Sequence, residues 1–161
     1  MISLPRLPQC LLIAAVLLHS QYLRVPSSDS DRSTPGQFFI VLDSPPAKAP
    51  VALQWEMSVP PAIIIGQRDI TIGKAAAIAG KSLTCAVKKN PADPRGAVRY
   101  VCILAGGKDP LANGPVATFR YRAQTEVGKA PIRVAIEKVL GVSADLKRIE
   151  IANTDAMIRI R

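Results

Sequence analysis

The residues best suited to chemistry in this sequence are a Gly-Lys-Ser tripeptide, a single histidine and three cysteines. Gly80, Lys81 and Ser82 match the end of a phosphate-binding loop, G-x-x-x-x-G-K-[ST], whose first glycine lets the backbone aim N–H groups at phosphate. The position of that first glycine holds Ala75, and the nearer glycine, Gly73, lies two residues too far away. The tripeptide therefore does not predict a nucleotide site.

The single histidine, His19, lies in a segment that we expect to be removed. Arg6 precedes an apolar run from Cys10 to Leu18, and His19 and a serine follow, which is the layout of a secretory signal peptide over residues 1–20. The run is shorter than the roughly twenty apolar residues of a membrane span, and an uncleaved anchor is the alternative. Removal of His19 would exclude Ser-His-Asp and Cys-His catalysis and histidine-ligated metals.

Carboxylate chemistry finds no support in the spacing either. The acidic residues are scattered singly, so nothing places two of them at the separation that glycoside hydrolysis requires. Asp29 and Asp31 form a close pair, but the remaining ligands of a calcium loop are missing. We therefore expect no enzymatic activity, no cofactor and no metal.

The charge balance indicates the chemistry of a partner. Lysine and arginine number 21 against 12 acidic residues, a net charge of +9. Outside the cytoplasm, in the periplasm or the medium, such a chain would attract acidic glycans, cell surfaces or acidic proteins, unless the charges are only solvated faces. Nucleic acid is not expected, because aromatic residues make up 4% of the chain and no binding motif is present.

The sequence after the predicted signal peptide has the pattern of an all-β domain. Residues 21–36 are rich in Ser, Asp and Pro and predict a flexible linker. From residue 37 the apolar residues alternate, and Gly, Pro and Asn separate the segments every eight to twelve residues, which favours a β-sandwich over 37–161. One helical turn is expected near 74–79. The expected strands are 37–43, 51–59, 69–72, 81–89, 97–105, 115–124, 131–139, 146–151 and 156–161.

The register that aligns the apolar faces of one hairpin brings two cysteines together. If Lys89 pairs with Val98 across the intervening loop, the apolar faces of the two strands align and Cys85 lies opposite Cys102. In an oxidising compartment this predicts a disulfide, worth about 3 kcal/mol. Two buried free thiols are the alternative, because directly opposed strand positions do not always suit the geometry of the bond.

Alternation also predicts which side chains point outward. Trp55 and Tyr100 lie on inward faces, and Tyr121 shares a face with Phe119, so few planar rings remain for stacking on a sugar. The outward positions of two strands carry pairs of arginines, which could form a basic binding face or a merely solvated surface. The predicted basic face consists of Arg120, Arg122, Arg159 and Arg161.

Several segments, taken in order, resemble a known family. They are "ALQWEM" at 52–57, "GKAAAIAGKSLTC" at 73–85, "YVCILAG" at 100–106, "LANGPVATFRYRA" at 111–123 and a late "VLGVSAD". In this order they are similar to the cohesin-like domains of secreted bacterial proteins, over approximately residues 37–161. The resemblance implies a nine-stranded jelly-roll sandwich, shared with certain carbohydrate-binding modules. It also implies that Gly80–Ser82 turn the chain into the next strand, with the Lys81 side chain in solvent.

The resemblance implies binding rather than catalysis. Cohesins bind dockerins, small calcium-loaded helical modules, through one face of the sandwich, and no dockerin-contact residues can be assigned here. We therefore expect a secreted module that binds a protein partner. A dockerin-like module is one such partner. The alternative is a polysaccharide-binding module that recognises acidic glycans through the basic face.

Overall fold

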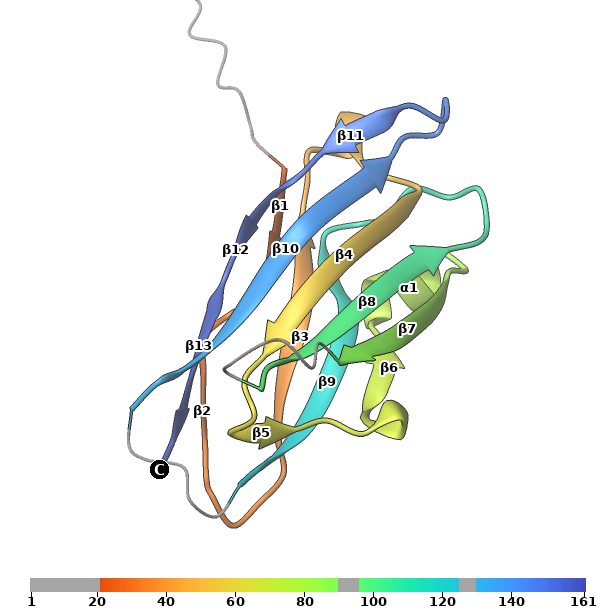
Figure 1. Cartoon of the computed structure of the whole chain (residues 1–161). Coiled ribbons are helices and arrows are strands. Elements are labelled where there is room, and N and C mark those ends of the chain that lie inside the picture. The colour runs from red at the N-terminus through yellow and green to blue at the C-terminus, as the bar shows by residue number, and fades with distance from the viewer. Residues whose placement is uncertain (1–20, 90–95, 125–129) are drawn as a thin grey trace, which may run out of the picture.

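Two β-sheets face each other across a single core (Figure 1). The structure is a computed structural model that describes residues 21–89, 96–124 and 130–161. Sheet A contains β1 (Tyr22–Arg24), β3 (Gly36–Asp43), β5 (Ile63–Ile64), β6 (Ile70–Ile72), β9 (Gly114–Ala123) and β12 (Ala152–Thr154). Sheet B contains β2 (Ser28–Ser30), β4 (Ala52–Val59), β7 (Ser82–Lys89), β8 (Val98–Ala105), β10 (Ile132–Val142), β11 (Arg148–Glu150) and β13 (Ala156–Ile160).

The chain crosses between the two sheets several times, although the long strands β4, β7 and β8 all lie in sheet B. The order in sheet A is β12-β1-β3-β9-β5, with β6 also pairing β9, and the order in sheet B is β2-β13-β10-β4-β8-β7, with β11 pairing β10. Thus β3 and β4 lie in opposite sheets, and β9 lies across the sandwich from its chain neighbours β8 and β10. The predicted β-sandwich is confirmed. Each of the nine expected strands matches one of the thirteen strand segments among the described residues, and the other four, β1, β2, β5 and β12, were not expected.

Inward side chains of both sheets form the core, as the period of two predicts. Trp55 and Met57 of β4 are fully buried, and the rings of Phe38 and Phe119 from neighbouring strands of sheet A stack at 5.2 Å between centroids. The buried Tyr100 hydroxyl donates to the Ile65 carbonyl at 2.9 Å, and burial raises the pKa of this phenol. Predictions that Trp55, Tyr100 and Tyr121 face inward are confirmed.

Short helical segments connect the strands. They are η1 (Pro46–Lys48), η2 (Gln67–Asp69) and α1 (Lys74–Ile78), the last where the sequence predicts a helical turn. Gly80 follows α1 with φ +64°, a conformation that suits glycine, and leads the chain into β7. No helix in these described ranges is long and apolar enough to span a membrane.

Residues 21–36 differ from the flexible linker that their composition predicts. β1 pairs with β3 and with β12, and β2 pairs in parallel with β13. Leu23 and Val25 are buried, and the Gln21 side-chain amide donates to the Ser44 hydroxyl at 2.8 Å. Strands of three residues are too short to show alternation, and apart from β3 the partners that order them, β12 and β13, lie more than a hundred residues away along the chain. The predicted signal peptide, residues 1–20, lies outside the described residues.

Candidate functional site

The outer face of sheet B presents exposed apolar side chains at the centre of four long antiparallel strands. Ile103 of β8 is 47% exposed and lies opposite Thr84 of β7 on one side and Gln54 of β4 on the other. Leu140 of β10 is half-buried and lies on the far side of Gln54, while Val101 is the next outward residue of β8. We call this surface the Ile103 face. It consists of Val101, Ile103, Leu140, Glu56, Arg99, Glu137 and Lys138.

A cluster of ion pairs borders the apolar part of the Ile103 face. Glu56 and Glu137 lie directly opposite each other on β4 and β10, an arrangement that is destabilising for like charges. Arg99 contacts both carboxylates, Glu56 at 3.3 Å and Glu137 at 3.8 Å, and Lys138 binds Glu56 at 3.0 Å. The charges of the face are therefore largely compensated within it.

A bulge in β10 places Lys138 within reach of Glu56. The pairing of β10 with β4 shifts register between Glu137 and Leu140, and Lys138 has φ +49°. A bulge redirects side chains at one point of a strand. Here Glu137 and Leu140, three residues apart, both lie on the outer surface, opposite Glu56 and Gln54, which alternation alone would not do.

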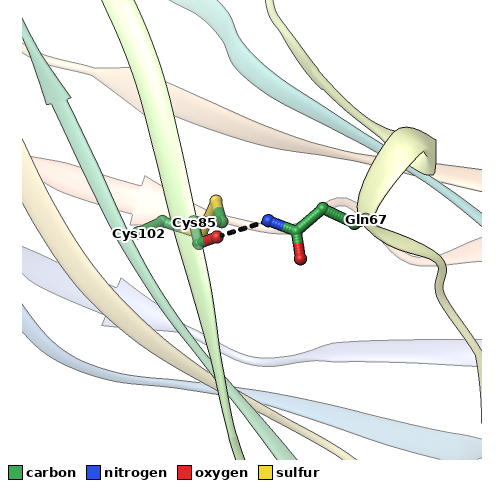
Figure 2. The surroundings of a disulfide bond; sticks show 3 residues. All are labelled: Gln67, Cys85 and Cys102. Carbon is green, nitrogen blue, oxygen red and sulfur yellow. Dashed lines mark hydrogen bonds between the residues drawn. A yellow bond between two sulfur atoms is a disulfide. The ribbon is translucent and has the colours of Figure 1, made fainter.

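A disulfide holds together the two strands at the edge of the Ile103 face. Cys85 and Cys102 form a disulfide (Figure 2). The two strands have the register predicted from the sequence, with Lys89 opposite Val98. The side-chain amide of Gln67 donates to the Cys85 carbonyl at 3.1 Å, which gives the free edge of β7 a hydrogen-bond partner. Cys102 points into the core, so its neighbour Ile103 points out of a strand that is covalently fixed to β7.

The four arginines of the predicted basic face lie on two different sheets. Arg120 and Arg122 belong to β9 in sheet A, whereas Arg159 belongs to β13 and Arg161 follows it in sheet B. Arg161 pairs with Asp29. The structure brings together the members of each pair but not the two pairs, because alternation along a strand does not tell which sheet the strand joins.

Lys81 is not in solvent, contrary to the expectation from the sequence. It is 7% exposed, and its ammonium donates to the Gly107 carbonyl at 3.2 Å. Loss of hydration lowers the pKa of Lys81, and the nearby Asp109 carboxylate opposes this shift. The glycines at 106 and 107, both with positive φ, fold the loop after β8 over the lysine. Lys81 thus anchors a loop, and nothing in this arrangement forms a phosphate cradle.

The described residues include no group of three or more His, Cys, Asp or Glu placed to hold a metal ion.

The Ile103 face was missed by sequence reasoning, which looked for arginines and planar rings. One signal for it was available: Ile103 alternates with Cys102 and Leu104, so an inward cysteine implies an outward isoleucine.

No protein-family model matches the sequence, and no curated protein matches it either. Solved structures of cohesins do resemble the fold. The sixth cohesin of scaffoldin B from Acetivibrio cellulolyticus, in complex with a Cel5 dockerin, has a TM-score of 0.70 at 8% identity, covering 88% of this chain and 99% of that one. The OlpA cohesin from Clostridium thermocellum, in complex with a dockerin, has a TM-score of 0.69 at 10% identity with the same coverage.

A third structure comes from outside the bacteria. The non-cellulosomal cohesin of the archaeon Archaeoglobus fulgidus has a TM-score of 0.65 at 10% identity, covering 88% of this chain and 91% of that one. At such identities the likeness concerns the fold, and it spans almost the full length of each domain. The resemblance predicted from the sequence is confirmed at this level: the chain has the fold of the cohesin domains.

Proposed function

We propose that the chain is a non-catalytic module that binds a protein partner on the Ile103 face. The observation that carries the proposal is the exposed Ile103, with Val101 next to it on the outer face of β8 and Leu140 across Gln54, bordered by charged residues. An apolar centre within a polar rim is the usual anatomy of a protein interface. The cohesins from Acetivibrio and Clostridium that share this fold are in complexes with dockerins, which supports a dockerin-like partner.

The rigidity of the surface supports the same function. The Cys85–Cys102 bond and the Gln67 hydrogen bond fix β7 against β8, and the ion pairs hold β8, β4 and β10 together across the face. A surface that is ordered before binding loses less conformational freedom when the partner docks. The disulfide also supports an oxidising compartment, and we propose that the module acts outside the cytoplasm.

An acidic polysaccharide on one basic face, the alternative from the sequence, has weaker support. Its four arginines lie on two sheets, and one of them already pairs with an aspartate. Trp55 and Tyr100 are buried and offer no stacking surface. A protein partner therefore remains the better proposal.

The test is a capture experiment with matched variants. The immobilised protein is exposed to extracellular proteins of the source organism with and without calcium, and retained proteins are identified by mass spectrometry. We expect a calcium-dependent partner to be retained by the wild type and lost with Ile103→Glu. Ile78→Glu is the control, since Ile78 is an exposed isoleucine on α1, outside the Ile103 face.

Three results would contradict the proposal. One is that the wild type retains no protein. Another is that Ile103→Glu retains the same partner as the wild type. A third is that Ile78→Glu abolishes capture to the same extent, because the loss would then not depend on the face. Retention that is unchanged without calcium would contradict only the dockerin-like nature of the partner.

A further inference from the structure

The outer face of sheet A carries cations that have no carboxylate partner among the described residues. Arg24, Arg120 and Arg122 are exposed there, and the ion pairs of residues 21–89, 96–124 and 130–161 include none of the three. Asp43, opposite Tyr22 at one end of this face, is not in an ion pair with any of them in the same ranges. We call this surface the arginine face. It consists of Tyr22, Arg24, Gln37, Phe39, Val41, Thr118, Arg120 and Arg122.

The strand register shows how these side chains are arranged. Arg120 lies opposite Gln37, Thr118 lies opposite Phe39, and Arg24 lies opposite Val41. Outward residues two apart on one strand are separated by about 7 Å, and neighbouring strands by about 5 Å. Arg120 and Arg122 therefore lie toward one end of the Phe39–Val41 pair and Arg24 toward the other.

The centre of the arginine face is apolar and partly exposed. Phe39 and Val41 are outward residues of β3, and both are only half-buried. Tyr22 is 39% exposed on the neighbouring strand. Arginine and aromatic side chains are enriched at the centres of protein interfaces, whereas a sugar platform needs a well-exposed planar ring. The composition of the face thus favours a protein over a polysaccharide.

The charge of the face defines the chemistry of the partner. Guanidinium groups bind carboxylates through two parallel hydrogen bonds and are weakly hydrated, so they are suited to ion pairs that become buried. Three such groups of one sign, with no internal compensation, attract an oppositely charged surface. An acidic protein that presents carboxylates around an apolar residue matches both the arginines and the Phe39–Val41 centre.

We propose that the arginine face is a second docking surface, which binds an acidic protein segment. It lies on the sheet opposite to the Ile103 face, so the domain can hold two partners at once (Figure 1). This inference does not depend on the proposed function, since the two surfaces share no residue.

The test is an NMR titration of the full ¹⁵N-labelled protein with a synthetic dodecapeptide of alternating glutamate and leucine. We expect saturable shifts of the amides in β1, β3 and β9, and weaker binding at higher salt. The double variant Arg120→Glu, Arg122→Glu should bind at least about tenfold more weakly. The control is Arg148→Glu, Arg159→Glu, which changes the net charge equally at two exposed positions of sheet B and should bind as the wild type does.

Each other outcome would overturn the proposal. If the amide shifts are confined to sheet B, or if no shift is saturable, the arginine face does not bind an acidic peptide. Equal weakening by both double variants would indicate non-specific charge attraction. Polygalacturonate that shifts the same amides with equal or higher affinity would indicate an acidic glycan site instead. Ile103→Glu should leave this titration unchanged, so the two surfaces are tested separately.

Discussion

The two outer faces of the sandwich both combine apolar side chains with cations, but they differ in how their charges are compensated. On the Ile103 face, Glu56 and Glu137 are bound by Arg99 and Lys138 within the sheet. On the arginine face, no ion pair within the described residues joins Arg120 or Arg122 to a carboxylate. The first face can dock a partner mainly through its apolar centre, whereas the second requires a partner of opposite charge.

Whether a charge is paired within its sheet also decides whether it contributes to stability or to binding. Charges that are paired within the sheet contribute to folding, and a partner gains little from them because they are already satisfied. Unpaired cations contribute nothing to folding and repel one another weakly, but they remain available to a ligand. Substitutions of charged residues on the two faces should therefore have opposite effects: they should change stability on the Ile103 face, and they should change binding with little effect on stability on the arginine face.

The largest expected effect is loss of the disulfide, which lies wholly in sheet B. The double variant Cys85→Ala, Cys102→Ala removes a cross-link between residues separated by 17 positions, which should cost about 3 kcal/mol of unfolding free energy. Urea denaturation monitored by tryptophan fluorescence measures it, since Trp55 lies in the core beside β8. Reduced wild-type protein should lose a similar amount. A loss below about 1 kcal/mol would show that the hairpin does not need the bond.

The second prediction concerns the centre of the ion-pair cluster. Glu56→Gln leaves Arg99 and Lys138 without their main carboxylate, and the Glu56 side chain is only 16% exposed. We expect a loss of about 1–2 kcal/mol of unfolding free energy, because a partly buried group of charges is left unbalanced. The control is Arg120→Gln on the arginine face, which should change stability by less than about 0.5 kcal/mol. Equal losses in the two variants would contradict the distinction between the faces.

The sequence correctly predicts features of the sandwich that depend on nearby residues in the chain. The register of β7 and β8 follows from apolar alternation and one loop, both of which lie within some twenty residues, and it is correct residue for residue. The inward position of Trp55 follows from the same alternation. Such features depend on neighbours in the chain, so the chain itself contains the information.

Long-range features are missed for a physical reason. The division of the four arginines between two sheets depends on which strands pair, and β9 pairs with β3 although some seventy residues separate them. Burial of Lys81 depends on the loop that follows β8, whose Gly107 lies 26 positions further along the chain. Val87 shows a smaller departure: alternation places it with the inward residues, but it is 42% exposed because β7 lies at the edge of its sheet.

The smallest expected effect is also the sharpest test of the unpaired arginines. Gln37→Glu places a carboxylate directly opposite Arg120, and a cross-strand pair of opposite charge at an exposed site should raise the unfolding free energy by about 0.3–0.5 kcal/mol. The same carboxylate competes with an acidic ligand, so binding of the glutamate–leucine peptide should fall several-fold. Stability is measured by urea denaturation and binding by the NMR titration.

A matched control exists on the other sheet. Gln54→Glu changes the same residue type at an exposed position of a central strand, but its partners there are Ile103 and Leu140 rather than an arginine, and Glu56 lies two residues away. This variant should lose a few tenths of a kcal/mol through repulsion and leave peptide binding unchanged. If both variants gained stability, or if Gln37→Glu bound the peptide as tightly as the wild type, Arg120 would not be a free cation available to a partner. If only Gln37→Glu gains stability and loses peptide binding, the Arg120 guanidinium can form one ion pair at a time. It then stabilises the fold when the sheet provides a carboxylate, and it binds a partner when the sheet does not.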